Sequence, residues 1–190
     1  METMNDIGQL VVRTLFDVAI ILVLLRLLLQ LFRADFYNPI SQAVVRATSF
    51  LDPLRKVLGA RGGLDLTTLV ALVALKMAQL AVLYAMAHGV TPGPVFLLAT
   101  SGLSLVSLLL KVFFWSIIAS VVVSWLAPDG RSPATQLLWS LTEPLLAPAR
   151  RLLPPLGGLD FSPIIVLLVI NILDDYGVPA LAGLVQRALF

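Results

Sequence analysis

The chain contains no cysteine and only one histidine, and both shortages narrow its chemistry. Without cysteine, the sequence has no disulfides, no thiolate metal site and no CxxC redox motif. Charged residues make up 13% of the chain, whereas soluble domains carry roughly 25%. The net charge is only +2, so no nucleic-acid contact is predicted. A chain so poor in charge is not expected to stay soluble.

Motifs that would indicate catalysis or cofactor binding are also missing. The sequence has no nucleotide-binding loop, no cluster of metal-ligating residues and no nucleophile–base–acid set. The single histidine, His88, follows an apolar run, and we expect an interfacial residue rather than a ligand. Residues 1–15 lack a basic segment followed by a small-residue cleavage site, so no removable signal peptide is expected. The sequence therefore predicts neither an enzyme nor a cofactor.

Hydrophobic residues, in contrast, make up 59% of the chain and gather in long runs. A helix of about 20 apolar residues crosses a hydrocarbon core of roughly 30 Å. The runs predict an all-α membrane protein with about four transmembrane helices, at residues 14–33, 66–87, 108–126 and 162–178. We expect Gly177 and Pro179 to kink or end the last of these helices.

The third run leaves alternatives open. Residues 95–126 form a largely apolar stretch of 32 residues, about 48 Å long as one helix. We interpret residues 108–126 as the span and residues 89–107 as a connector. Within that connector, residues 95–107 are either an N-terminal extension of the helix or a partial, re-entrant piece, and a fifth full span is the rival.

A motif between the first two runs occurs again between the last two. The copies lie 94 residues apart at their beginning and 95 apart at their end. The first copy reads Asn38-Pro39-Ile40-Ser41-Gln42, Pro53-Leu54-Arg55-Lys56 and Gly62-Gly63-Leu64-Asp65, and the second reads Ser132-Pro133-Ala134-Thr135-Gln136, Pro148-Ala149-Arg150-Arg151 and Gly157-Gly158-Leu159-Asp160. The chain is therefore interpreted as two repeats, at residues 1–88 and 108–190.

Each copy predicts an amphipathic helix, at residues 39–51 and 133–146. Asn38 and Ser132 suit the N-cap, and the proline after each suits the first helical position. Apolar residues then recur at steps of 0, 3, 4, 7 and 11, on one helix face. They are Ile40, Ala43, Val44, Ala47 and Leu51 in the first copy, and Ala134, Leu137, Leu138, Leu141 and Leu145 in the second. This stripe either lies in the headgroup region or packs across the ends of the spanning helices.

Proline, glycine and aspartate divide the rest of each copy. We expect Pro53, Pro144 and Pro148 to break the amphipathic helices. The Gly-Gly pairs supply a turn. Asp65 and Asp160 then stand where the N-caps of the next helices belong.

Basic residues favour a cytoplasmic position for both motif copies. Lysine and arginine concentrate in the two loops, whereas residues 87–110 contain neither. Both loops lie on one side only if an even number of crossings separates them, so the two helix–loop–helix repeats are expected to be parallel. The candidate sites for anionic lipid or a protein partner are Arg55, Lys56, Arg150 and Arg151.

Several polar groups lie inside or beside the predicted spans, where each is a functional candidate by default. They are Arg26, Lys76, Lys111, Asn171, Asp174 and Asp175. Helix rise places Lys111 at a depth similar to the two aspartates, so a pair with Asp174 or Asp175 is expected. Arg26 is expected to reach toward the cytoplasmic headgroups. These groups either pair to fix helix packing or line a polar path for ions or a small solute.

The doubled pattern resembles the YggT family of bacterial inner-membrane proteins over nearly the whole chain. The second copy, from Arg131-Ser132-Pro133 to Phe161-Ser162-Pro163, looks closest to the family's usual form. The first copy departs from that form at residues 59–61 and after Asp65. The resemblance implies a multi-pass protein of the bacterial inner membrane linked to osmotic-stress tolerance, ion homeostasis and cell-envelope or division functions. Plastid relatives are tied to cytochrome maturation and nucleoid organisation, and no catalytic residue is implied.

Two functional hypotheses follow from the motif and the resemblance. In the first, a non-enzymatic scaffold, assembly or envelope-stress factor acts through cytoplasmic, basic, amphipathic loops. Its partners would be membrane lipids, anionic ones included, and a membrane protein. In the second, the chain is a small ion channel or transporter, or a modulator of one, in osmotic or ion homeostasis. A thin bundle of four spans also leaves a homo-oligomer open.

Overall fold

The structure is a computed structural model that describes residues 2–58, 60–61, 64–126, 132–152 and 160–189. Its helices are α1 (Glu2–Leu31), α2 (Pro39–Ala47), α3 (Asp52–Leu58), α4 (Leu66–His88), α5 (Pro94–Leu126), α6 (Pro133–Leu152), α7 (Ser162–Ile172) and α8 (Val178–Leu189), with a 3-10 turn η1 (Ser49–Leu51) and a π-helical turn η2 (Leu173–Gly177). Strands β1 (Ala60–Arg61) and β2 (Leu64–Asp65) form only a short antiparallel ribbon.

Four helical segments in the described part of the chain are long and apolar enough to cross a membrane. They are Asp6–Leu31, Leu66–His88, Pro94–Leu126 and Ser162–Ala188. This confirms the predicted all-α membrane fold with four spans. Each of these segments exposes several large apolar side chains, as a lipid-facing surface requires.

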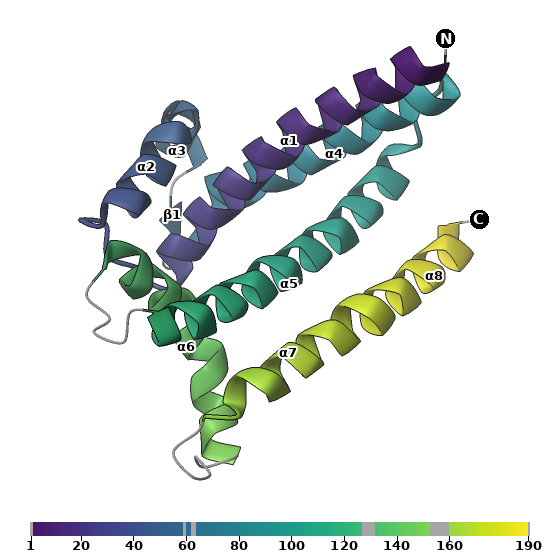
Figure 1. The fold of residues 1–190 in the computed structure, drawn as a ribbon. Helices are drawn as coiled ribbons and strands as arrows, with labels where there is room; N and C mark the ends of the chain where they lie inside the picture. The colour runs from purple at the N-terminus through teal and green to yellow at the C-terminus, as the bar shows by residue number, and fades with distance from the viewer. Residues whose placement is uncertain (1, 59, 62–63, 127–131, 153–159, 190) are drawn as a thin grey trace.

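The four long helices run beside one another and divide the molecule into two ends (Figure 1). α1 and α5 run toward the end that carries α2, α3 and α6, while α4 and the α7–α8 segment run away from it. Both termini and the α4–α5 connection lie at the opposite end. The two helix pairs thus have the same direction, as expected for parallel repeats.

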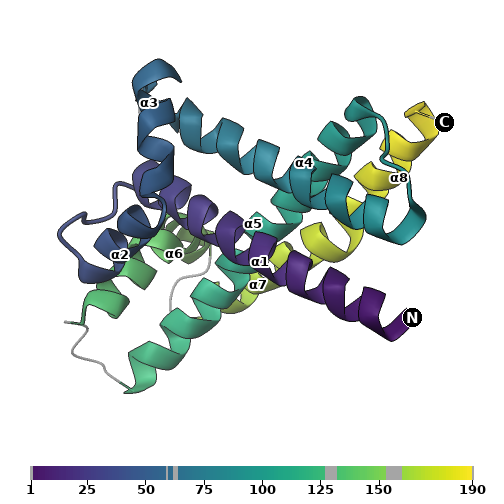
Figure 2. The ribbon, with the colours of Figure 1, turned by 90° about the horizontal axis from the view of Figure 1, so that it is seen from above.

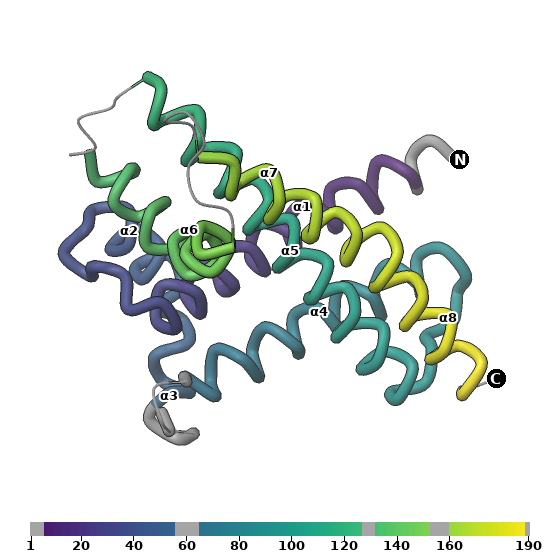
Figure 3. Tube along the Cα trace, turned by 90° about the horizontal axis from the view of Figure 1, so that it is seen from below, coloured from purple at the N-terminus to yellow at the C-terminus, as the bar shows by residue number. Residues whose placement is uncertain are grey.

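The two copies of the motif meet at one end of the bundle. We call α2, η1, α3 and α6 the motif platform. Views from above and below show α2 and α6 next to each other, and α6 changes direction along its length (Figures 2 and 3). Elements 94 residues apart in sequence are therefore neighbours in space.

The apolar core lies near the motif platform, where the second half of α1 meets the other helices. Ile20, Val23 and Leu28 of α1 are buried there with Ile117 of α5 and Leu141 of α6. The first half of α1 instead exposes its apolar side chains. The bundle is consequently tightly packed beside the platform and open toward the termini.

α1 and α5 are both longer than the predicted spans. α1 begins at Glu2 rather than at residue 14, because residues 2–13 contain no proline that would end the helix. α5 is one helix over Pro94–Leu126, so residues 94–107 extend the helix and only residues 89–93 connect it to α4. The extension is thus the alternative that the structure shows, in place of a partial piece or a fifth span.

The prediction that Pro144 and Pro148 break the second amphipathic helix is wrong. α6 continues to Leu152 with both prolines inside it. The two prolines are four residues apart and exposed, so they share the outer face of the helix. There the carbonyl groups that lose an amide partner remain accessible, which lowers the cost of an interior proline.

Gly177 and Pro179 do not end the last helix either. The π-helical turn η2 lies immediately before them, and α8 continues to Leu189. A wider turn accommodates a residue without an amide hydrogen, because the hydrogen-bond ladder is already shifted there. Two of the expected N-caps are confirmed: Asn38 accepts from the Ile40 amide, and Asp65 accepts from the Thr67 amide. The prediction for Asp160 is wrong by one residue, because Phe161 is the N-cap of α7.

The predicted apolar stripe packs inward along most of its length in the second copy and only in part in the first. In α6, Leu141 is buried and Leu137, Leu138 and Leu145 are half-buried. In the first copy, Val44 and Leu51 of the stripe are buried together with Ser41 and Thr48, whereas Ile40, Ala43 and Ala47 are exposed. The difference has a local cause, because Arg26 of α1 draws Thr48 inward through hydrogen bonds.

Replacing Ile117 with alanine should destabilise the bundle. Ile117 is fully buried between the helices, and removing buried aliphatic atoms leaves a cavity that typically costs about 2–5 kcal/mol. We expect a loss of at least about 2 kcal/mol in the free energy of unfolding, measured by titration of detergent micelles with a denaturing detergent. Leu98→Ala on the exposed face of the same helix is the matched control, and an equal loss in both variants would contradict the described core.

Candidate functional site

Arg26 joins α1 to the motif platform. Its side chain is only 2% exposed and donates to the Thr48 carbonyl at 2.7 Å and the Thr48 hydroxyl at 3.1 Å. The same guanidinium pairs with Asp52, the first residue of α3, at 2.6 Å. The expectation that Arg26 reaches toward the headgroups is therefore wrong, because Thr48 at the end of α2 and Asp52 of α3 supply its partners within the protein.

Arg55 and Asp65 close the first motif loop. The Arg55 Nε lies 3.2 Å from the carboxylate of Asp65, which is almost fully buried. Asp65 also accepts hydrogen bonds from the Thr67 amide and the Thr68 hydroxyl. Burial raises the pKa of Asp65, but the Thr68 hydrogen bond and the Arg55 charge outweigh burial, so its pKa lies below the usual value. The residue is an N-cap, as expected, and also an ion-pair partner.

The second motif loop closes in the same way. The Arg150 Nε lies 2.9 Å from Asp160, and its Nη1 lies 2.8 Å from both carboxylate oxygens of Glu143. Asp160 in turn accepts from the Ser162 amide at the start of α7. Burial again raises the pKa of Asp160, but the hydrogen bonds from Ser162 and Arg150 outweigh burial, so the pKa lies below its usual value.

These two pairs are equivalent positions of the repeat. Arg55 and Arg150 are 95 residues apart, and so are Asp65 and Asp160, so each pair spans ten residues of its loop. We call this contact the loop clasp. The equal spacing of arginine and aspartate in both copies was a signal that sequence reasoning could have used, but it did not anticipate the pairing or the partners Asp52 and Glu143.

The four basic candidates of the motif are therefore not alike. Arg55 and Arg150 are engaged in the loop clasps, and Arg151 is exposed. The side chain of Lys56 lies outside the described residues. Only Arg151, among the described three, keeps its charge free for a ligand.

One hydrogen bond connects the two copies of the motif. The Asn38 side chain donates to the carbonyl of Pro133, the first residue of α6, at 2.6 Å. Asn38 also caps α2, so a single residue fixes the start of one motif helix against the start of the other. The motif platform is held together across the repeat boundary.

Exposed aromatic side chains lie on the platform and just before α2. Phe36, Tyr37 and Phe50 of the first copy and Trp139 of the second are all exposed. Arg33, Arg46 and Arg151 are exposed on the same segments. We call these seven residues the platform rim. A mixture of aromatic and cationic side chains is typical of protein surfaces at the level of lipid headgroups.

Within the first repeat, a series of side-chain hydrogen bonds connects α1 to α4. Lys76 donates to Gln79 at 2.7 Å, and the Gln79 amide donates to Asp17 at 2.7 Å and to the Arg13 carbonyl at 3.2 Å. Gln79 is buried, while Lys76 extends toward α5. Sequence reasoning selected Lys76 but overlooked Asp17 and Gln79.

The second repeat connects α5 to η2 through charged groups. Lys111 lies 3.8 Å from Asp174, which also accepts a hydrogen bond from Ser107. The structure thus shows one of the two expected pairs, whereas Asp175 and Asn171 are exposed. Lys111 stands 94 residues after Asp17, and Asp174 stands 95 after Gln79. Equivalent positions of both repeats therefore make the interhelical polar contact.

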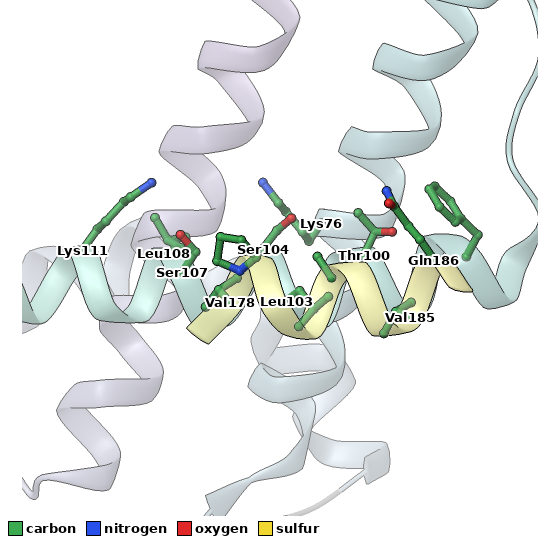
Figure 4. A pocket seen from close by; sticks show the side chains of 13 residues that line it. Lys76, Thr100, Leu103, Ser104, Ser107, Leu108, Lys111, Val178, Val185 and Gln186 are labelled. Carbon is green, nitrogen blue, oxygen red and sulfur yellow. The ribbon is translucent and has the colours of Figure 1, made fainter. Parts of the chain in front are cut away.

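A pocket of about 560 Å³ opens between α4, α5 and α8. Lys76, Lys111 and Ser104 contribute polar groups to its lining (Figure 4). In the described part of the chain, no group of three or more histidine, aspartate or glutamate side chains is placed to hold a metal ion. The pocket therefore provides hydrogen-bond donors and positive charge to a ligand.

Comparison with known proteins agrees with the duplication. Residues 5–86 and 99–181 each match the family model described as CCB3/YggT. A protein of Pseudomonas aeruginosa, named as uncharacterized, is 43% identical over 183 residues, which are 95% of this chain and 93% of that protein. The uncharacterized protein YggT of Escherichia coli K12 is 36% identical over 166 residues, 85% of this chain and 84% of its own. No solved structure matches the chain significantly.

The loop clasps should make stability fall in acid. Both aspartates have lowered pKa values, so their contribution is complete above the usual pKa near 4 and is lost as the pH falls through the lowered values. Asp65→Asn keeps a capping side chain but removes the charge, and we expect a loss of about 1–2 kcal/mol at neutral pH. Its unfolding midpoint should then change less than that of the unsubstituted chain between pH 6 and pH 3.

The exposed Asp6 is the matched control for this measurement. Asp6→Asn should leave both the stability at neutral pH and its acid dependence unchanged. Identical pH profiles for Asp65→Asn and the unsubstituted chain would show that the clasp contributes nothing.

Proposed function

We start from the fact that the chain belongs to the CCB3/YggT family, and we propose that it is a non-enzymatic scaffold or assembly factor of the bacterial inner membrane. It presents the motif platform, on the cytoplasmic side, to anionic lipid and to a membrane-protein partner. The observation that carries this proposal is the platform itself, in which both motif copies are fixed by ion pairs while the rim stays exposed.

The contacts inside the platform support a preformed surface. Arg26 binds Thr48 and Asp52, the loop clasps connect each loop to the next span, and Asn38 joins the two copies. A surface that is already ordered loses little conformational entropy when it binds. The rim then supplies aromatic side chains with few rotatable bonds, which are the residues that dominate binding energy at interfaces.

The distribution of charge supports the cytoplasmic orientation. The exposed Arg33, Arg46 and Arg151 lie at the platform end, whereas the connection between α4 and α5 carries no lysine or arginine. The positive-inside rule places such a basic end in the cytoplasm. There it also meets the anionic leaflet surface, where each basic residue contributes about 1 kcal/mol to attraction.

A second candidate function is a role in ion movement or its control, as a small channel, transporter or modulator. The observation that favours it is the set of Asp17, Lys76, Lys111 and Asp174 within the spans, where charged groups are costly. Against a continuous ion path, Gln79 and Ser107 engage both carboxylates in contacts between neighbouring helices. We therefore rank scaffolding first.

The proposed orientation can be tested directly because the chain has no cysteine. Single cysteines introduced at Arg151 and at Val90 should report on opposite sides of the membrane. With a membrane-impermeant maleimide, we expect Val90→Cys to react in intact spheroplasts and Arg151→Cys to react only after permeabilisation. Labelling of Arg151→Cys from outside would overturn the orientation and, with it, the cytoplasmic platform.

Rim and interior substitutions separate the two candidate functions. For a scaffold, Tyr37→Ala combined with Trp139→Ala should reduce recovery of a crosslinked membrane partner about ten-fold or more, since an anchoring aromatic contributes on the order of 2 kcal/mol. Leu184→Ala, which removes an exposed apolar side chain from α8, should leave recovery unchanged. The second function is tested by measuring ion flux in lipid vesicles that contain the purified chain. Flux that is abolished by Lys76→Gln with Asp174→Asn would favour a transporter.

A further inference from the structure

We propose that the pocket between α4, α5 and α8 binds one phosphate oxyanion, carried by the headgroup of a lipid or by free phosphate. This site is remote from the motif platform and does not depend on the function proposed above. The argument rests on what lines the pocket, on which of its polar groups lack partners, and on the charges that face it.

The polar lining comes from three helices and converges on one space. On α5, Thr100, Ser104, Ser107 and Lys111 follow steps of four, three and four residues and therefore share one helix face. Lys76 enters from α4 and Gln186 from α8. Figure 4 shows the ammonium groups of Lys76 and Lys111 directed to the same side of α5. None of the lining residues is acidic.

Several donors of this lining are not used by the protein. The Lys76 ammonium donates one hydrogen bond, to Gln79, and within the described residues it lies in no ion pair. Lys111 is 61% exposed and lies at the long distance of 3.8 Å from Asp174. Each ammonium has three N–H groups, so most of their capacity is free. Among the described contacts, Thr100, Ser104 and Gln186 make no side-chain hydrogen bond.

Free donors beside an apolar lining favour a ligand that carries acceptors, because a polar group without a partner is unfavourable away from water. The charges facing the site are those of Lys76 and Lys111, with Arg13 beyond Lys76, against Asp17 and Asp174. Both carboxylates are already bonded, to Gln79 and to Ser107. An anion with several acceptor oxygens supplies both the charge and the hydrogen-bond acceptors that are missing.

The rest of the lining favours an amphiphile as the source of the oxyanion. Phe96, Leu103, Leu108, Val178 and Val185 form an apolar wall beside the polar groups. A volume of about 560 Å³ exceeds what a free phosphate would fill, and leaves room for glycerol and the first acyl carbons. The two sources share the same phosphate chemistry, so an experiment with one arm for each decides between them.

The test uses the full chain purified in a mild detergent. Native mass spectrometry measures retention of phosphatidylglycerol against diacylglycerol, which lacks the phosphate, and a second arm measures binding of inorganic phosphate by calorimetry. We expect Lys76→Gln with Lys111→Gln to lose one bound phosphatidylglycerol per chain relative to the unsubstituted chain, with an affinity at this site reduced at least ten-fold. Arg187→Gln, which removes an exposed cation of α8 outside the lining, should change nothing.

A second variant guards against misfolding of the lysine double variant. Ser104→Phe fills the pocket and keeps both charges, and it should cause the same loss while the melting temperature stays within a few degrees. Binding of the lipid alone, or of inorganic phosphate alone, supports the site and shows which of the two supplies the phosphate group. Equal retention of the two lipids without phosphate binding would show that the phosphate is not recognised, and undiminished binding in both variants would show that the ligand binds elsewhere. Either result overturns the proposal.

Discussion

The structure depends on the need to turn the chain at the membrane surface without leaving buried charge or backbone groups unpaired. Each repeat meets this need with the loop clasp, in which an arginine pairs with an aspartate ten residues later. The same aspartate satisfies the amide groups at the start of the next span. One carboxylate therefore ends the loop, begins the helix and neutralises a cation. Removing it would leave a positive charge and free amides at the edge of the hydrocarbon region, where both are costly.

Duplication provided two copies of this solution, and the copies have diverged around it. Arg26 anchors the first motif to α1, but Ser120 stands 94 residues later and cannot make such a contact. Glu143 strengthens the second clasp instead. In the spans, the contact between equivalent positions is retained while its chemistry changes, from Asp17 with Gln79 to Lys111 with Asp174. The two repeats thus place an interhelical polar contact at equivalent positions, but the charges of the residues that make it differ.

This division assigns different tasks to the two ends of the molecule. The platform end is tightly packed, cross-linked by polar contacts and surrounded by aromatic and cationic side chains, which suits recognition of a surface or partner. Toward the termini, the helices separate enough to leave a pocket lined by donors. In an apolar medium such donors are strong determinants of what can bind, because water competes little there. A scaffold that also carries a specific lipid would combine both properties in one small bundle.

Much of the architecture could be predicted from the sequence alone. Long apolar runs determine four spans, since only helices satisfy the backbone in lipid, and Asn38 and Asp65 mark helix starts through their own local geometry. The pairings Arg26–Asp52 and Arg55–Asp65 were decided by tertiary structure, as was the passage of α6 through Pro144 and Pro148. The sequence predicted a partner for Lys111, but only the packing selected Asp174 over Asp175. Composition and periodicity report which groups are polar and which helix face they occupy. Which partner each polar group finds depends on how the helices pack, because a charge in a membrane protein is stabilised by whatever neighbouring helices bring within a few ångströms of it.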